Sequence, residues 1–97
     1  MPGATPSDEL DVRRRRILFR AWHRGMREMD LLMGRFADAH VAELTEEEIA
    51  SFERLIEAID RDLFAWLTDA EPTPAAYDDA LWRRLKTFHT HQKPLHA

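Results

Sequence analysis

The sequence contains no cysteine, and this absence excludes several classes of site at once. Disulfide bonds, thiol nucleophiles and cysteine-ligated zinc or iron–sulfur clusters all require sulfur side chains that the chain does not have. The absence leaves the cellular compartment undecided, because cysteine-free proteins occur on both sides of a membrane.

Long apolar runs are absent as well. No segment approaches the roughly 18 consecutive apolar residues that cross a bilayer, and the N-terminal stretch lacks the apolar core of a secretory signal. Three acidic residues there, Asp8, Glu9 and Asp11, argue against a mitochondrial transit peptide. The sequence therefore predicts a soluble intracellular protein without membrane insertion.

Glycine is scarce, with three residues and none after Gly34, and no alternating run of β-branched residues occurs. Apolar residues instead recur at the i, i+3, i+4 spacing of amphipathic helices. A chain of 97 residues is long enough for one small core. We therefore predict an all-α fold, a compact bundle of about five helices over residues 13–90, between flexible segments at 1–12 and 91–97.

Capping and turn signals divide the chain into helices. These are expected at about 9–24, at about 26–42, from Thr45 onward, at about 61–69, and from Pro74 onward. Thr45 and Glu48 have the Thr-x-x-Glu spacing of a capping box, and Asp60 is the expected N-cap of the fourth helix. The third helix is expected to bury Ile49, Phe52, Leu55, Ile56 and Ile59.

The first two helices share one apolar stripe, so the period alone does not separate them. Arg24 followed by Gly25 separates them, because arginine in a last turn and glycine just beyond it form a helix C-terminal signal. We therefore predict a turn at these two residues.

Seven arginines and no acidic residue lie between residues 13 and 27, so this stretch carries +7 and the rest of the chain −11. On a helical wheel four of them fall within about 60° of one another, opposite Leu18 and Trp22. They are Arg13, Arg16, Arg20 and Arg24. This basic stripe could be a solvated face, a surface for an acidic protein, or a nucleic-acid-binding face. The −11 elsewhere would repel phosphate, so no nucleic-acid partner is expected.

The segment RGMRE, Arg24 to Glu28, predicts a compact polar corner. Glycine lets another backbone approach closely, and arginine presents a planar fork of donors. Glu28 near the start of the following helix is favoured by the helix dipole. A purely structural corner, in which Arg24 or Arg27 pairs with Glu28 and nothing binds, is the alternative.

Two sets of residues suggest chemistry without supporting it. His23 and Glu28 could exchange protons, but no nucleophile, metal cluster or phosphate loop accompanies them, so no catalytic residue is predicted. His89, His91 and His96 could be metal ligands, yet residues at i, i+2 point to different sides of a helix. We expect these histidines to be exposed in the C-terminal tail, without a metal.

The segments RGMREMDLL (24–32) and DRDLFAWL (60–67) together resemble the succinate dehydrogenase FAD assembly factors, small flavinators that share an Arg-Gly-x-x-Glu motif. The resemblance covers about residues 13–88. It implies a five-helix bundle that is not an enzyme. It also implies binding to the flavoprotein subunit of succinate dehydrogenase, and in some bacteria to that of fumarate reductase, with covalent attachment of FAD to a histidine of that subunit.

The resemblance also implies where the partner binds. Arg24, Gly25 and Glu28 match the motif that lies against the flavoprotein, and His23 stands where many members have a second basic residue. The expected partner-binding set is Arg24, Gly25, Glu28, Arg27, Asp30, Arg20 and His23. No stably bound cofactor is implied, since FAD belongs to the client. A cytoplasmic bacterial protein, monomeric when free, is expected, and an adaptor that uses the Arg-rich helix to bind RNA or an acidic protein is the alternative.

Overall fold

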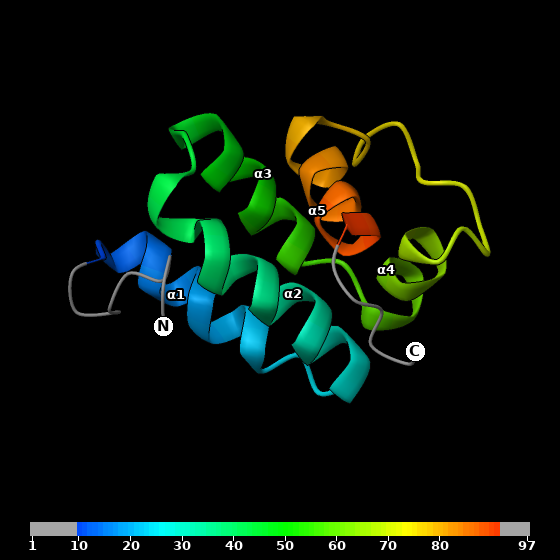
Figure 1. Cartoon of the computed structure of the whole chain (residues 1–97), viewed down its shortest axis with the longest axis horizontal. Coiled ribbons are helices and arrows are strands. Elements are labelled where there is room, and N and C mark those ends of the chain that lie inside the picture. The colour runs from blue at the N-terminus through cyan, green and yellow to red at the C-terminus, as the bar shows by residue number, and fades with distance from the viewer. Residues whose placement is uncertain (1–9, 92–97) are drawn as a thin grey trace.

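The computed structural model describes residues 10–91, without the side chains of Thr90 and His91, and this part of the chain is helical with no strand (Figure 1). The helices are α1 (Val12–Trp22), α2 (Arg27–His40), the short 3-10 helix η2 (Val41–Glu43), α3 (Glu46–Ile56), α4 (Asp60–Leu67) and α5 (Ala80–His91). The predicted all-α bundle of five α-helices is confirmed. The predicted flexible segments, 1–12 and 91–97, lie almost entirely outside the described residues.

The helices α1 and α2 run side by side in opposite directions and form one layer of the bundle (Figure 1). Helix α3 packs against α1 and α5, and α5 also packs against α2. The corner that joins α1 to α2 therefore lies at one end of the α1–α2 pair. Its position next to the α3–α4 connection follows from side-chain contacts described below.

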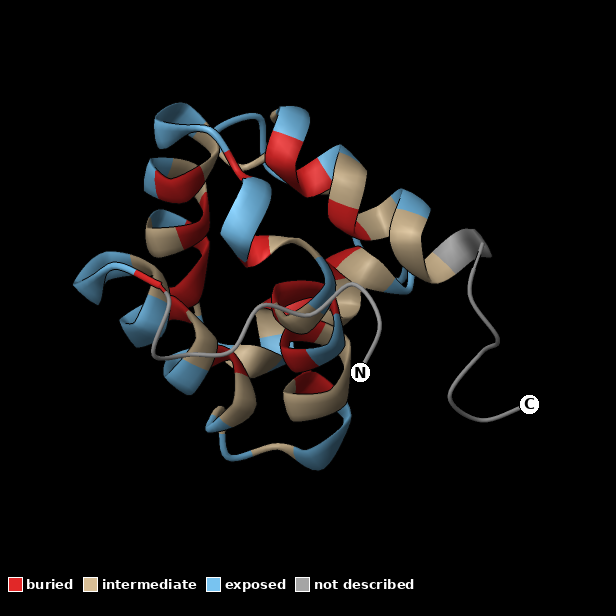
Figure 2. Ribbon diagram, turned by 60° about the vertical axis from the view of Figure 1, so that its left-hand side comes forward, coloured by how far each residue is buried: buried red, intermediate tan, exposed pale blue. Residues whose placement is uncertain are grey.

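Buried residues, coloured red along the ribbon in Figure 2, form one hydrophobic core. They come from all five α-helices, and the largest of them are Trp82, Phe36, Phe52, Ile17, Met29 and Met33. Burial of such side chains stabilises the fold by about 1.5–3 kcal/mol each relative to exposure. This single core holds the five α-helices in place relative to one another and so fixes the surfaces that they carry.

Several predicted boundaries are confirmed. Helix α1 ends at Trp22 and α2 begins at Arg27, so the chain turns at Arg24 and Gly25. The capping box is present: the Glu48 N–H donates to the Thr45 hydroxyl at 3.1 Å, and the Thr45 N–H donates to the Glu48 carboxylate at 3.0 Å. Local sequence was sufficient here because each partner lies within three residues.

Two predictions at the start of α4 are wrong. Asp60 is the first residue of the helix and makes no N-cap hydrogen bond, because its carboxylate accepts instead from Arg24, 36 residues earlier. Ile59, expected in the core, is 54% exposed. The α3 pattern ends at Ile56, and the three residues that follow leave the helix, so Ile59 no longer shares its apolar face.

The predicted start of α5 at Pro74 is also wrong, since the helix begins at Ala80. The Asp79 carboxylate accepts from the Trp82 N–H at 3.0 Å and so caps the helix there. Ahead of the helix, the Trp82 indole N–H donates to the Thr73 hydroxyl at 3.1 Å, and the Tyr77 ring packs on Trp66. These tertiary contacts hold residues 73–79 outside the helix.

His89 does not lie in an exposed tail as predicted. It belongs to α5 and is half-buried, with its Nε2 2.7 Å from the carbonyl oxygen of Leu32 in α2. Because a carbonyl only accepts, Nε2 carries the hydrogen and donates. Burial lowers the pKa of this imidazole below its usual value near 6.5.

The lowered pKa of His89 predicts a pH dependence of folding. The unfolded chain takes up a proton at His89 near pH 6.5 while the folded chain resists it, so stability is complete above about pH 6.5 and falls below that value. Urea unfolding at pH 7.5 and pH 5.5 measures the loss. The loss should shrink in His89→Gln, whose amide can still donate to Leu32. An unchanged pH dependence in that variant would assign it to other groups.

Candidate functional site

The corner between α1 and α2 is built around one carboxylate. Asp30, in the first turn of α2, accepts hydrogen bonds from the backbone N–H of Arg24 at 2.6 Å and of Gly25 at 3.3 Å. Gly25 has φ +102°, a conformation that residues with a side chain rarely adopt. A Cβ built there would meet no atom within 4 Å, so the outer side of Gly25 is open.

The Arg24 side chain points inward from this corner. Only 8% of it is exposed, and its Nε donates to Asp60 at 2.7 Å. Its two terminal nitrogens donate to the carbonyl oxygens of Ile56 at 2.5 Å and Ala58 at 2.6 Å. These carbonyls lie where α3 ends and would otherwise lack partners. Arg24 therefore fastens the α1–α2 corner to the α3–α4 connection.

The predicted site divides into a support and an outer face. Arg24 and Asp30 form the support, because their charged groups bond within the protein. Gly25, Arg27 and Glu28 are exposed. Within residues 10–91, neither Arg27 nor Glu28 makes a side-chain hydrogen bond or ion pair. The alternative in which Glu28 pairs with Arg24 or Arg27 is therefore wrong, and both side chains are available at the surface.

The two remaining predicted residues lie at the end of α1. Arg20 donates to Glu57 at 2.8 Å, so its charge is paired within the protein. His23 is the C-terminal cap of α1, and its ring stacks on that of Phe19 with centroids 4.0 Å apart. His23 thus contributes a flat, exposed ring next to the corner, and Arg20 contributes structural support.

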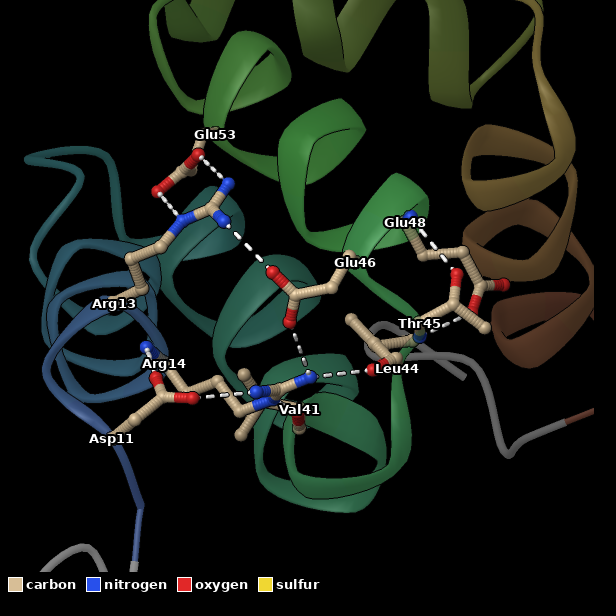
Figure 3. Close-up of polar contacts among 9 residues, drawn as sticks. All are labelled: Asp11, Arg13, Arg14, Val41, Leu44, Thr45, Glu46, Glu48 and Glu53. Atoms are coloured by element: carbon tan, nitrogen blue, oxygen red, sulfur yellow. Dashed lines mark hydrogen bonds and ion pairs between the residues drawn. The ribbon is translucent and has the colours of Figure 1, made fainter.

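The basic stripe is not the free surface that the helical wheel suggested. Arg13 donates to Glu53 at 2.6 Å and to Glu46 at 3.1 Å, both in α3 (Figure 3). The hydrogen bond from Arg13 holds the pKa of the Glu53 carboxyl below its usual value. Arg20 and Arg24 likewise pair with Glu57 and Asp60. Three of the four stripe arginines therefore pair with acidic residues of α3, its C-cap and the start of α4, and Arg16 is exposed.

Arg14 was not singled out by the sequence, yet it has a similar role at the other end of α1. Its guanidinium donates to the carbonyl oxygens of Val41 at 3.0 Å and Leu44 at 2.6 Å, where α2 and η2 end (Figure 3). It also donates to Asp11 at 2.6 Å. Asp11 thus forms an ion pair with Arg14, three residues on. Arg14 near the start of α1 and Arg24 just after its end therefore both bond to carbonyl oxygens where other helices end.

Sequence reasoning missed two exposed apolar side chains beside the corner, Phe19 and Ile59. A signal for Phe19 was present, because this aromatic lies outside the apolar stripe of Leu18 and Trp22. Ile59 carried no such signal, since it continues the apolar spacing of α3. Its exposure depends on where that helix ends.

Neither a cluster of metal ligands nor a helix that could span a membrane is found in the described residues. No group of three or more histidine or acidic side chains among them is arranged to hold a metal ion. The side chain of His91 and all of His96 lie outside the described part. None of the helices in residues 10–91 is both long and apolar enough to cross a membrane.

Comparison with known proteins agrees with the resemblance of the corner motif. Residues 15–89 match the family described as the flavinator of succinate dehydrogenase. The chain is 39% identical over 83 residues to succinate dehydrogenase assembly factor 2-A, mitochondrial, of Drosophila yakuba, and this match covers 84% of the chain and 51% of the relative. It is 37% identical over 83 residues to assembly factor 2-B of Drosophila melanogaster, with 84% and 53% covered.

The chain thus spans about half the length of the curated relatives that it matches. The family match includes the whole α1–α2 corner, the α3–α4 connection and most of α5. It therefore covers both the outer face and the support of the candidate site. Because the match extends over most of the sequence, this chain belongs to the succinate dehydrogenase flavinator family.

Proposed function

We propose that this chain binds the flavoprotein subunit of succinate dehydrogenase and promotes the covalent attachment of FAD to it. The observation that carries the proposal is the outer face of the corner, where Gly25 is bare and Arg27 and Glu28 are unpaired within the described residues. The family description, flavinator, and the relatives' names, assembly factor 2, support the same assignment.

The proposed action is conformational. Covalent attachment needs the flavin ring and the accepting side chain of the client in reactive alignment, and such alignment can lower a barrier by several kcal/mol. A partner that binds the aligned conformation more tightly than the others raises its population. The chain then needs no catalytic residue and no resident cofactor, because FAD stays with the client.

The corner suits this action because hydrogen bonds hold its inner side in place and its outer side at Gly25 is open. Arg24 and Asp30 fix the backbone at both sides of Gly25 through contacts with the protein interior. A partner backbone can approach Gly25 closely, while Arg27 and Glu28 offer one cation and one anion beside it. Such a fixed surface loses little conformational entropy on binding.

The rival function, an adaptor that binds RNA or an unrelated acidic protein through the basic stripe, has little free charge to use, because three of the four stripe arginines are paired within the protein. Arg13, Arg20 and Arg24 are already paired with carboxylates of α3 or its end. The flavoprotein of fumarate reductase as a second client, a bacterial cytoplasmic location and a monomeric free state stay predictions. The matched relatives carry the word mitochondrial in their names.

Covalent flavin on the client tests the proposed function directly. The flavoprotein subunit is separated by denaturing electrophoresis from cells with and without this gene, and in-gel flavin fluorescence is measured. We expect fluorescence to fall without the gene and to return when the wild-type gene is restored. Equal fluorescence with and without the gene, at equal amounts of client, would refute the proposal.

Glu28→Ala should impair flavinylation far more than folding. Glu28 is exposed and makes no side-chain hydrogen bond or ion pair in the described residues, so the main loss is its interaction with the α2 dipole, about 0.3–1 kcal/mol. A lost charge-assisted hydrogen bond to the client would cost about 1.5–3 kcal/mol, which is roughly a tenfold to hundredfold weaker complex. Flavin fluorescence and urea unfolding measure the two effects.

Glu28→Gln is the matched control, since it keeps the length of the side chain and removes the charge. A defect similar to that of Glu28→Ala would assign the contact to the charge. If Glu28→Ala instead unfolds the bundle while activity per folded molecule stays at the wild-type level, Glu28 has a structural role.

A further inference from the structure

The large apolar side chains that are most exposed in the described residues lie together. Val12 is 58% exposed, Phe19 63% and Ile59 54%. Val12 and Phe19 are seven residues apart in α1, which places them on one face two turns apart. Phe19 and Ile59 line the same open hollow of about 380 Å³, between the end of α1 and the α3–α4 connection. The three side chains therefore form an apolar surface centred on Phe19, and Arg20, Arg24 and Asp60 also line the hollow between Phe19 and Ile59.

Phe19 is held in place on this surface. Its ring stacks on His23 with an angle of 16° between the planes, and His23 Nδ1 donates to the Phe19 carbonyl oxygen at 2.6 Å. Both rings also line a second open hollow of about 610 Å³ together with Val12 and Arg15. An aromatic side chain that is already ordered loses little entropy when a partner covers it.

The unpaired charge around these hollows is positive, because the one carboxylate that lines them, Asp60, is paired with Arg24. Arg15 is exposed and, within residues 10–91, makes no side-chain hydrogen bond or ion pair. It therefore differs from Arg13 and Arg20, whose charges are paired with carboxylates near α3. An apolar surface with an unpaired cation fits a partner segment that combines an apolar side chain with a carboxylate.

This surface continues into the corner described above. Arg24, the first residue of the Arg-Gly-x-x-Glu motif, lines the hollow that contains Phe19 and Ile59, and it directly precedes Gly25 in the chain. A partner that lies over Gly25 is therefore next to Phe19. A second copy of this chain is a poorer occupant, because a two-fold contact would bring Arg15 and its neighbour Arg16 toward their own copies.

We propose that a second contact area for the flavoprotein subunit is formed by the Phe19 surface, which consists of Val12, Phe19, His23 and Ile59. This inference rests on the proposed function. A segment of that subunit places an apolar side chain in the hollow beside Phe19 and a carboxylate beside Arg15. The corner and the Phe19 surface then bind one client as a continuous interface.

The test measures binding of the full-length chain to the purified flavoprotein subunit by biolayer interferometry. Phe19→Ser should raise Kd at least about tenfold, as expected for a central aromatic contact. Arg15→Glu should slow association and reduce its dependence on salt. Thr87→Ser, an exposed position on α5, is the control and should bind as the wild type does. Circular dichroism establishes that each variant is folded.

Ile59→Ser provides an independent variant from another part of the chain, and it should weaken binding even if Phe19→Ser fails to fold. Wild-type affinity in folded Phe19→Ser and Ile59→Ser would overturn the inference and leave the proposed function standing. Failure of the wild-type chain to bind the flavoprotein would overturn both. If Phe19→Ser retains flavoprotein binding but loses binding to vesicles of phosphatidylglycerol, the surface binds membranes and the inference is also overturned.

Discussion

Arg24→Ala should destabilise the bundle by about 3 kcal/mol, because removing one member of a buried, hydrogen-bonded ion pair leaves the other uncompensated. The Asp60 side chain is only 17% exposed, and the carbonyls of Ile56 and Ala58 would lose their donors. For a domain of this size the melting temperature should fall by roughly 12–24 °C. Urea unfolding and thermal melting followed by circular dichroism measure the change.

Arg27→Ala is the matched control, since Arg27 lies three residues away, is exposed and has no side-chain partner in the described residues. Its stability should stay within about 0.5 kcal/mol of the wild type. The double variant Arg24→Met/Asp60→Leu should regain much of the lost stability, because it removes both buried charges together. If Arg24→Ala unfolds like the wild type but abolishes flavinylation, Arg24 is a client contact and its assigned structural role is wrong.

Gly25→Arg should reduce covalent flavin on the client to the level found without the gene. The new side chain would extend into the open space over the corner, where the client is proposed to lie. The backbone at φ +102° is also strained by any Cβ, so a stability loss of about 1–3 kcal/mol accompanies the substitution. In-gel flavin fluorescence at matched amounts of folded chain separates the two effects.

Gly25→Ala is the control for Gly25→Arg, because it introduces the same backbone strain with only a methyl group. It should lose similar stability yet retain most of the flavinylation per folded molecule. Equal loss of activity in both variants would indicate that the backbone conformation matters and the open space does not. Wild-type fluorescence in a folded Gly25→Arg chain would remove the corner from the interface.

The corner itself was predictable from local sequence, because its signals lie close together. Arg24 and Gly25 form the turn after α1, and Asp30, whose carboxylate accepts from both of their N–H groups, is at most six residues further on. The capping box of α3 was predictable for the same reason. In both places the interacting groups lie within six residues of each other at the start of a helix, so their spacing along the chain largely sets their spacing in the folded protein.

Local sequence did not predict which residues of the motif support the fold and which are exposed. Arg24 and Arg27 both lie within two residues of Gly25, yet the side chain of Arg24 is only 8% exposed, whereas Arg27 is exposed. The two arginines differ because Asp60 and the end of α3 pack beside Arg24. Both of these partners lie more than 30 residues from Arg24 in the sequence. A helical wheel indicates which residues share a face but not which charge lies opposite that face.

By itself, the sequence determined the helical class, the turn at Gly25, the main core positions of α3 and the family to which the chain belongs. Periodicity, caps and a short motif carry this information because they act over one or two helical turns. Only the tertiary structure decided that Arg13 and Arg20 of α1 pair with Glu53 and Glu57, that Ile59 is exposed and that α5 starts at Ala80. These outcomes depend on long-range packing, in which a distant partner competes with the local signal.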